Sequence, residues 1–279
     1  MSDEETATAF VPGHVTGFFS VHRTDDPTTT GSRGAGLALS EGVTVRVEPA
    51  EAASVWLNGL SIEMPPVERV LSALSAPARV EAETSLPLGS GFGVSGALSL
   101  GAALAAADAF DRALSENELV TIAHGAEVTC GTGLGDVVGQ ARGGAPIRLE
   151  PGAPGEGLLD GIPARSRVEY LALGELATED VITGDTDRLS AAGADALSRL
   201  VEEPTLPRFM YASRRFAREA GVLTERVREV VSDVSEAGGE ASMAMLGETV
   251  FAVGTGLSDA GYDANACRVH AAGATLTGE

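Results

Sequence analysis

Hydrophobic and polar residues alternate along two stretches in the first half of the chain, and this period of two predicts half-buried strands. Val43, Val45 and Val47 alternate with polar residues in one stretch, and residues 78–86 repeat the pattern in the other. Residues 54–57 form a short apolar run, which we expect to pair with the strand around Val45. Strands of this kind offer one apolar face for helices to cover.

The apolar stretch 9–20 is interrupted by Pro12 and Gly13, which predicts two strands joined by a turn. Residues 25–36 are polar and rich in glycine, so we expect a loop there. The first strands of the sheet would therefore be followed by a long polar connection.

Three helices are predicted before the middle of the chain. Residues 65–76 place apolar side chains on one face, whereas the Ala- and Leu-rich run 94–112 is apolar all round, as a buried helix requires. Ser115, followed three residues later by Glu118, predicts a capping box for a third helix that extends toward Val128.

A Pro- and Gly-rich stretch at 150–161 predicts a connection between two domains, 1–157 and 158–279. The second domain is predicted to contain a strand, three helices and a hairpin, in this order: 168–173, 187–201, 206–220, 223–234 and the residues after Gly238 and Gly239. This order of elements indicates an α+β fold with helices on one face of a mostly antiparallel sheet.

The 279 residues include 40 acidic and 19 basic side chains, for a formal net charge of −21. Such a surface repels nucleic acid and anionic lipid, so we expect neither as a partner. Molar salt would screen the repulsion within about 3 Å, and we therefore expect a halophilic source and unfolding in dilute buffer. The acidic first residues, the absence of a long apolar run and the separation of Cys130 from Cys267 predict a reduced, cytoplasmic protein.

The sequence contains no lysine, so every basic side chain is an arginine. Walker-type phosphate loops, protein kinases and pyridoxal-phosphate enzymes all depend on a lysine. These three classes are excluded, and positive charge at a functional site must come from arginine or a metal ion.

The Gly-rich stretch 87–97 leads directly into the predicted helix at 94–112. Its glycines permit a ligand to approach the backbone, and a helix N-terminus favours phosphate. Gly91 to Gly96 also matches the G-x-G-x-x-G dinucleotide fingerprint, but a further helix follows where a parallel strand is needed, which argues against a dehydrogenase. The alternative is a tight turn that only packs a helix against a sheet.

Glu127 and Asp136 flank a second Gly-rich stretch at 131–139. Asp136 is placed to approach a substrate hydroxyl and Glu127 to hold Mg²⁺, which prefers a few carboxylate or hydroxyl oxygens together with nucleotide phosphates. In so acidic a chain the alternative is a solvated helix residue and a capping residue.

The stretch Pro87-Leu88-Gly89-Ser90-Gly91-Phe92-Gly93-Val94-Ser95-Gly96-Ala97 resembles the Pro-x-x-x-Gly-Leu-Gly-Ser-Ser-Ala-Ala motif of the GHMP kinases. Phe10 to His14 resembles the first motif of this family, and Glu127 to Gly144 resembles its acidic segment. Residues 238–247 match the third motif in part, with methionines where glycines are usual. The resemblance implies a two-domain α+β GHMP kinase fold, with a ribosomal-protein-S5-domain-2-like N-terminal half and a ferredoxin-like C-terminal half.

Residues 9–19, 31–36 and 132–137 are similar to a branch of this family, the archaeal pantoate kinases. The resemblance implies transfer of the γ-phosphate of ATP to the terminal hydroxyl of pantoate, on the way to coenzyme A. Asp136 would then be the base or orienting group. Mg²⁺ would lie on Ser95 and Glu127, and ATP would bind the loop that supplies Pro87, Gly89, Ser90, Gly91, Phe92, Gly93, Val94, Ser95 and Gly96.

Pantoate carries a carboxylate, and a guanidinium fork binds a carboxylate best. Arg33 and Arg148 are the predicted anchors, and His14 adds a donor beside them. For each of them the alternative is a surface arginine or a strand-end histidine. The other histidines lack local partners and are not predicted to bind metal: His22, His124 and His270.

Residue spacing alone does not distinguish pantoate from another small hydroxy acid, so homoserine, mevalonate and shikimate-like acids stay open as acceptors. A nucleotide-binding protein without catalysis is the alternative from a different class, and the altered third motif favours it. Such a protein would bind ATP without substrate-dependent release of ADP. The default assembly is a homodimer.

Overall fold

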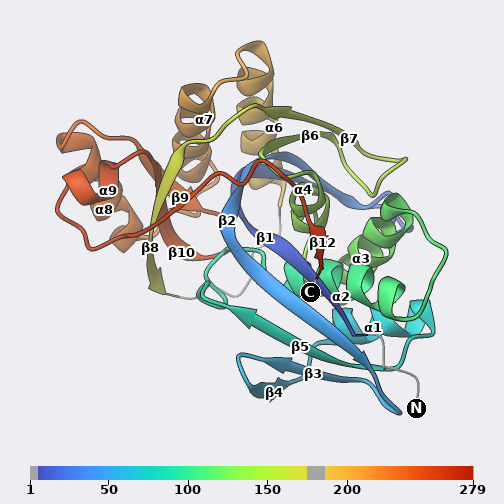
Figure 1. Ribbon diagram of the computed structural model, residues 1–279. Helices are drawn as coiled ribbons and strands as arrows, with labels where there is room; N and C mark the ends of the chain where they lie inside the picture. Colours follow the sequence, from blue (N-terminus) through green and yellow to red (C-terminus); the bar gives the residue numbers. More distant parts are fainter. Residues whose placement is uncertain (1–5, 175–185, 279) are drawn as a thin grey trace.

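The computed structural model describes residues 6–174 and 186–278. An eight-stranded sheet and a four-stranded sheet form two regions, each covered by helices (Figure 1). All strand pairs except one are antiparallel within the described residues, so the predicted α+β class is confirmed. No helix within these ranges is long and apolar enough to cross a membrane.

The larger sheet is built on two long antiparallel strands, β1 (Ala7–His22) and β2 (Gly31–Pro49). The strand β5 (Ala78–Thr84) pairs with β2 and separates it from β3 (Ser54–Leu57), which pairs with β5 in parallel. The predicted pairing of β3 with β2 is therefore wrong, because β5 occupies that edge of β2. The short strand β4 (Leu60–Ile62) follows beside β3.

The turn predicted at Pro12 and Gly13 lies inside β1, which continues through both residues. The register between β1 and β2 shifts at this point, so the irregularity is absorbed as a bulge. Proline is tolerated at such a site because the ladder does not use an N–H there. The prediction of two strands and a turn is wrong for this reason.

The predicted loop at 25–36 is also shorter than expected, because β2 begins at Gly31. Small residues allow close contact with β1 here. A Cβ on Gly34 would lie 2.2 Å from the Phe18 carbonyl oxygen, and a Cβ on Gly36 would lie 2.3 Å from His14 Nε2. The glycines that suggested a loop are instead required for strand packing.

Four helices accompany the larger sheet: α1 (Pro65–Leu74), α2 (Val94–Ala109), α3 (Glu116–Cys130) and α4 (Asp136–Arg142). The helix α2 packs on β1 and β2 and is enclosed by α1 and α3, so almost all its residues are buried. The capping box at Ser115 is present at the start of α3. These features confirm the predicted helices.

The predicted connection at 150–161 is the turn region of a hairpin formed by β6 (Ala145–Glu150) and β7 (Leu158–Ile162), which extends the larger sheet from β2. The last strand, β12 (Thr275–Thr277), returns to pair with β1. The boundary at residue 157 stays a prediction, and the larger sheet takes strands from both sides of it.

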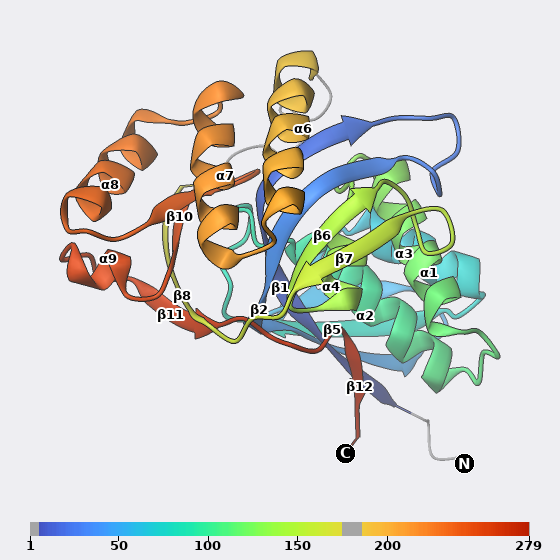
Figure 2. The ribbon, with the colours of Figure 1, turned by 90° about the horizontal axis from the view of Figure 1, so that it is seen from above.

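The smaller sheet has the strand order β11-β8-β10-β9. It confirms the predicted strand and hairpin of the second half, and its helices confirm the predicted helices. Helices α6 and α7 lie between the two regions, where α6 packs on β1 and α7 contacts both β1 and β9 (Figure 2). The elements are β8 (Arg167–Gly174), α6 (Asp187–Glu202), α7 (Leu206–Glu219), α8 (Glu225–Glu236), β9 (Ala241–Ala244), β10 (Glu248–Val253), α9 (Gly256–Asp259) and β11 (Asn265–Arg268).

Candidate active site

The Gly-rich loop before α2 depends on left-handed backbone conformations. Gly89, Gly91 and Gly93 have φ angles of 66°, 85° and 64°, which other residues rarely adopt. Gly93 is the N-cap of α2, so the loop ends where the helix presents its free N–H groups. The predicted Gly-rich loop at a helix start is confirmed, and phosphate binding there stays a prediction.

The partial third motif supports this loop from the smaller sheet. A Cβ on Gly247, in the β9–β10 turn, would lie 2.1 Å from the Ser90 carbonyl oxygen. Thr249 Oγ1 donates a hydrogen bond of 2.8 Å to the same oxygen. Met243 and Met245 are buried in the core. The unusual methionines therefore pack inside the protein, and the turn they flank holds the loop in place.

Asp136 lies directly against the start of α2. It is the first residue of α4, and a Cβ on either Gly93 or Gly96 would lie 3.4 Å from its Cβ. The glycines of the loop are thus needed for the approach of α4 as well as for any ligand. The predicted base and the predicted phosphate loop are brought together.

His14 on β1 holds the Asp136 carboxylate, with Nδ1 at 2.8 Å from Oδ1. His14 is fully buried, and burial lowers the pKa of its ring despite the nearby carboxylate. Burial alone would raise the pKa of Asp136, but the hydrogen bond from His14 and the charge of Arg148 outweigh it, so the pKa lies below its ordinary value. A neutral His14 therefore donates to an ionised Asp136.

Arg148 on β6 is 2% exposed, and its Nε and Nη1 have no hydrogen-bond partner among the described residues. The guanidinium rests on the backbone before α4, since a Cβ on Gly135 would lie 2.7 Å from Nε. Burial lowers the pKa of Arg148, and the charge of Asp136 opposes the shift. A buried guanidinium with free donors is costly unless an anion binds it.

Glu127 on α3 accepts hydrogen bonds from three hydroxyl groups. Ser95 and Ser99 donate to Oε1 at 2.8 and 2.6 Å, and Thr132 donates to Oε2 at 2.8 Å. Burial raises the pKa of Glu127, although these bonds oppose the shift. A Cβ on Gly133 would lie 3.0 Å from Glu127 Oε2 and 3.9 Å from Asp136 Oδ2. Glycine at this position therefore leaves the space between the two carboxylates open.

Unused hydrogen-bonding capacity concentrates around Asp136. His14 Nε2, Gln140 Oε1 and the two Arg148 nitrogens are buried without partners in the described part of the chain. The other polar atom of the Gln140 side chain, Nε2, donates a hydrogen bond of 2.9 Å to the Gly93 carbonyl oxygen. Buried polar atoms are normally paired, so such a cluster marks a place where a ligand or water completes the bonding.

Arg33 is not among the residues that contact this cluster. Its neighbour Ser32 faces Gly135, where a Cβ would lie 2.5 Å from Ser32 Oγ, so the alternation along β2 sends Arg33 to the other face. There it forms an ion pair with Glu150 and lines a groove against α6. The predicted contact of Arg33 with the substrate stays a prediction.

Sequence reasoning missed four residues of the site, of which Gln140 has been described above. Ser99 follows Ser95 by one helical turn, and that spacing was a usable signal for a shared partner. Thr132 lies in the Gly-rich stretch already noted. His124 is buried on α3 and donates from Nε2 to the Thr30 carbonyl oxygen at 2.8 Å; burial and the nearby charge of Arg148 lower its pKa. Only the fold reveals that His124 lies close to the site.

Residues 66–144 match the family model for the GHMP kinases N terminal domain. This range contains the Gly-rich loop together with Ser95, Glu127 and Asp136. The fold is that of the GHMP kinases, and this part of the chain matches their N-terminal domain.

The chain is 33% identical over 252 residues to the pantoate kinase of Methanocaldococcus jannaschii, which covers 88% of this chain and 91% of that protein. It is also 33% identical to the pantoate kinase of Thermococcus kodakarensis, with 88% of this chain and 86% of that protein covered. The chain belongs to the pantoate kinase family.

Solved structures agree with this assignment. A phosphotransferase related to the CoA biosynthesis pathway aligns with a TM-score of 0.86 and 29% identity over 98% of this chain and 99% of that one. A homoserine kinase from Cytophaga hutchinsonii aligns with a TM-score of 0.71 over 99% of each chain. Its identity is 18%, so it supports the fold alone.

Proposed function

We propose that this protein transfers the γ-phosphate of ATP to the terminal hydroxyl of pantoate. The observation that carries the proposal is the buried Arg148, which has free donors and whose charge acts on the carboxylate of Asp136. A substrate that has both a carboxylate and a hydroxyl fits this pair, because the guanidinium binds the carboxylate and Asp136 accepts from the hydroxyl. The pantoate kinases to which the chain is similar support the choice of acid.

Asp136 orients the hydroxyl more than it deprotonates it. Its lowered pKa makes it a weak base, and phosphoryl transfer passes through a loose transition state that needs little prior deprotonation. The carboxylate accepts the hydrogen bond of the attacking hydroxyl and takes the proton late in the reaction. Because Asp136 is ionised around neutral pH, its carboxylate can accept the hydrogen bond of the hydroxyl.

His14 acts on the reaction through Asp136 and does not contact the substrate. Its Nδ1 is used by Asp136, and its Nε2 is enclosed by Gly36 and Gly139, where a Cβ would lie 2.3 and 2.9 Å away. The ring therefore fixes one carboxylate oxygen of Asp136 and leaves the other for the acceptor. His14 is a positioning residue.

The nucleotide phosphates are proposed to lie at the Gly-rich loop and the start of α2, where free N–H groups favour anions. Ser95 and Glu127 fit Mg²⁺, because a hydroxyl and a carboxylate oxygen lie 2.8 Å apart in a partly buried setting. The described residues contain no group of three or more acidic, histidine or cysteine ligands, so phosphate oxygens would complete the coordination. Bound Mg²⁺ would neutralise phosphate charge and stabilise the ionised form of Glu127.

The proposal is tested by coupled ADP release with Mg-ATP at molar KCl, with pantoate, homoserine, mevalonate and shikimate offered separately. We expect turnover with pantoate alone. Turnover with another acid and none with pantoate would keep the kinase and reject the substrate. ATP binding without turnover on any of the four would instead support a binding protein. The homodimer stays a prediction that a mass measurement in the same buffer can check.

A further inference from the structure

A groove lined by arginine lies at the C-terminal end of α4, away from Asp136. It has a volume of about 650 Å³ and is bounded by the connection from β7 to β8 and by the segment after β11. We call it the Arg142 groove. Its lining includes Arg142, Gly144, Gly161, Pro163, Arg165 and Ala271.

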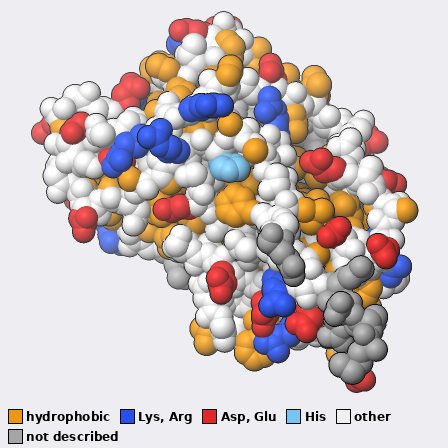
Figure 3. Space-filling model, viewed as in Figure 1, with side chains coloured by type: hydrophobic (Ala, Val, Ile, Leu, Met, Phe, Trp, Pro, Cys, Tyr) orange, Lys and Arg blue, Asp and Glu red, His pale blue; other side chains and the backbone are white. Residues whose placement is uncertain are grey.

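Further arginines extend the positive charge beyond the groove. Arg268 on β11 lies opposite Arg167 on β8, so both side chains leave the same face of the smaller sheet. Figure 3 shows several basic side chains close to one another, beside a histidine. Because the sequence has no lysine, all of them are arginines.

Three of these arginines are exposed and have no acidic partner among the described residues: Arg142, Arg165 and Arg268. Arg167 differs because it is paired with the buried Glu169. In a chain where acids outnumber bases by 40 to 19, a group of unpaired arginines is contrary to the general charge of the surface. Placing them together costs repulsion, which a bound anion would remove.

We propose that the Arg142 groove binds a small anion that carries a phosphate group. Guanidinium groups bind phosphate through paired hydrogen bonds, and the groove is of the size that small-molecule ligands occupy. The Arg142 guanidinium is seated over the backbone, since a Cβ on Gly161 would lie 2.9 Å from Nη2. Nucleic acids and anionic membranes fit less well, because the net charge of −21 repels an extended polyanion.

This site is distinct from the proposed active site. Asp136 and Arg142 are the first and last residues of α4, which separates them by roughly 9 Å along the helix. The Gly144 N–H donates to the His270 carbonyl oxygen at 2.7 Å, so the floor of the groove is tied to the C-terminal segment and not to the Gly-rich loop. The inference therefore does not rest on the identity of the acceptor substrate.

Isothermal titration with phosphoglycolate tests the site, with a non-hydrolysable ATP analogue present and at the salt concentration that keeps the protein folded. We expect the wild type to bind this probe. The double variant Arg142→Gln/Arg165→Gln should bind it at least about tenfold more weakly, the loss expected for charge-assisted hydrogen bonds. The single variant Arg165→Gln, in an exposed connection, should show part of the loss without risk to folding.

Two controls locate the binding. Arg69→Gln removes an exposed arginine on α1 that has no ion pair with residues 6–174 or 186–278, and it should leave the affinity unchanged. Arg148→Gln alters the proposed active site and should also leave the probe bound. The proposal is overturned if the wild type does not bind phosphoglycolate, if the double variant binds it equally well, or if only Arg148→Gln abolishes binding.

Discussion

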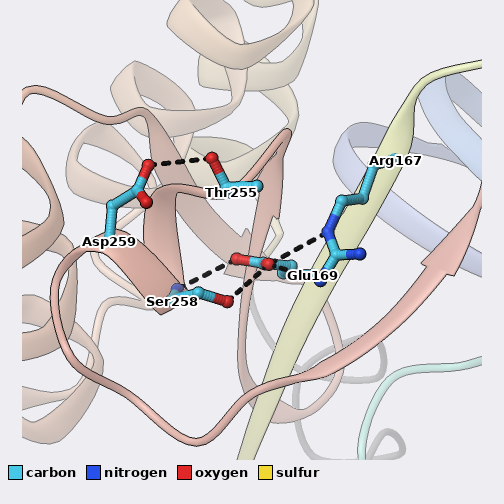
Figure 4. Close-up of polar contacts among 5 residues, drawn as sticks. All are labelled: Arg167, Glu169, Thr255, Ser258 and Asp259. Carbon is cyan, nitrogen blue, oxygen red and sulfur yellow. Dashed lines mark hydrogen bonds and ion pairs between the residues drawn. The ribbon is translucent and has the colours of Figure 1, made fainter.

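The protein contains two carboxylates that each lie near an arginine, the half-buried Asp136 in the larger region and the buried Glu169 on β8 in the smaller one. Glu169 is fully buried and accepts hydrogen bonds from Arg167 and Ser258 (Figure 4). The Ser258 backbone N–H donates to its second oxygen at 3.0 Å. Both oxygens of Glu169 are thus satisfied from within the protein.

The surroundings of Asp136 are different. Arg148 retains buried donor atoms without partners, whereas none of the buried unpartnered atoms in the described ranges belongs to Glu169, Arg167 or Ser258. A satisfied buried carboxylate fixes two elements together, and an unsatisfied cluster keeps bonding capacity for a ligand. The comparison teaches that incomplete bonding, and not a shifted pKa, separates the candidate active site from a structural ion pair.

The largest effect is expected for Asp136→Asn. The amide keeps the shape of the side chain but loses the charge that accepts the hydroxyl proton, so kcat should fall by about 10²–10⁴-fold. ATP affinity should change little, because the change acts mainly in the transition state. Steady-state ADP release and nucleotide titration measure the two quantities. Asp108→Asn, an exposed position on α2, is the matched control, and a kcat for Asp136→Asn close to that of this control would remove Asp136 from its role.

The next effect distinguishes the two predicted substrate arginines. Arg148→Gln removes a buried charge with free donors and should raise the KM for pantoate by about 10–100-fold, the worth of a hydrogen bond to a charged group. Arg33→Gln removes a half-buried arginine whose charge is already paired with Glu150, and it should change the KM much less. If Arg33→Gln raised the KM more than Arg148→Gln, the substrate carboxylate would instead be bound in the groove beside α6.

A pH profile tests the hydrogen bond from His14. This bond lowers the pKa of Asp136. In His14→Ala the burial that raises the pKa is therefore opposed only by the charge of Arg148 and the hydrogen bond from Thr16. Activity needs the ionised carboxylate, and it is lost as pH falls through the pKa of Asp136. The acid limb of kcat should therefore lie at higher pH in the variant than in the wild type. An unmoved acid limb with a lowered kcat would show that His14 only supports the fold.

The smallest effect on activity is expected for Glu169→Gln, which should lower the free energy of unfolding by about 1–3 kcal/mol and leave kcat unchanged. Burial raises the pKa of Glu169, but hydrogen bonds from Ser258 and Arg167 outweigh it and the net shift is downward. Its stabilisation is present above the ordinary glutamate pKa and is lost as pH falls through the lowered value.

Denaturant unfolding at several pH values measures the effect of Glu169→Gln. Glu203→Gln, which breaks an exposed ion pair with Arg208, should cost less than about 1 kcal/mol. If Glu169→Gln reduced kcat at unchanged stability, the division between a structural and a functional carboxylate would be wrong.

Much of the helical structure could be predicted from the sequence because its signals are local. Ser115 and Glu118 define a helix start without reference to the rest of the chain, and the apolar run of α2 can only be buried. The pairing of β3 could not be predicted, because the strand that separates it from β2 comes later in the sequence. Gly34 and Gly36 led to the wrong prediction of a loop for a related reason, since only their contacts with β1 show why they are glycines.

Some residues of the candidate site can likewise be found from local sequence, and others only from the fold. Asp136, Glu127 and Ser95 stand beside glycine-rich stretches, so local sequence and the family resemblance find them. The contact between His14 and Asp136 joins residues 122 positions apart, and the absence of partners around Arg148 is a property of packing. Halophily stays a prediction from charge alone, because screening depends on the solvent.

Phosphorus NMR of the reaction product tests the central claim most directly. The wild type is incubated with Mg-ATP and pantoate at molar KCl, and the proton-coupled spectrum of the new phosphate ester is recorded, with Asp136→Asn run in parallel. The account predicts a new resonance split into a triplet by the methylene protons of the terminal carbon, formed by the wild type and almost absent with the variant. A doublet from the secondary hydroxyl, no ester at all, or an equal yield from Asp136→Asn would contradict it.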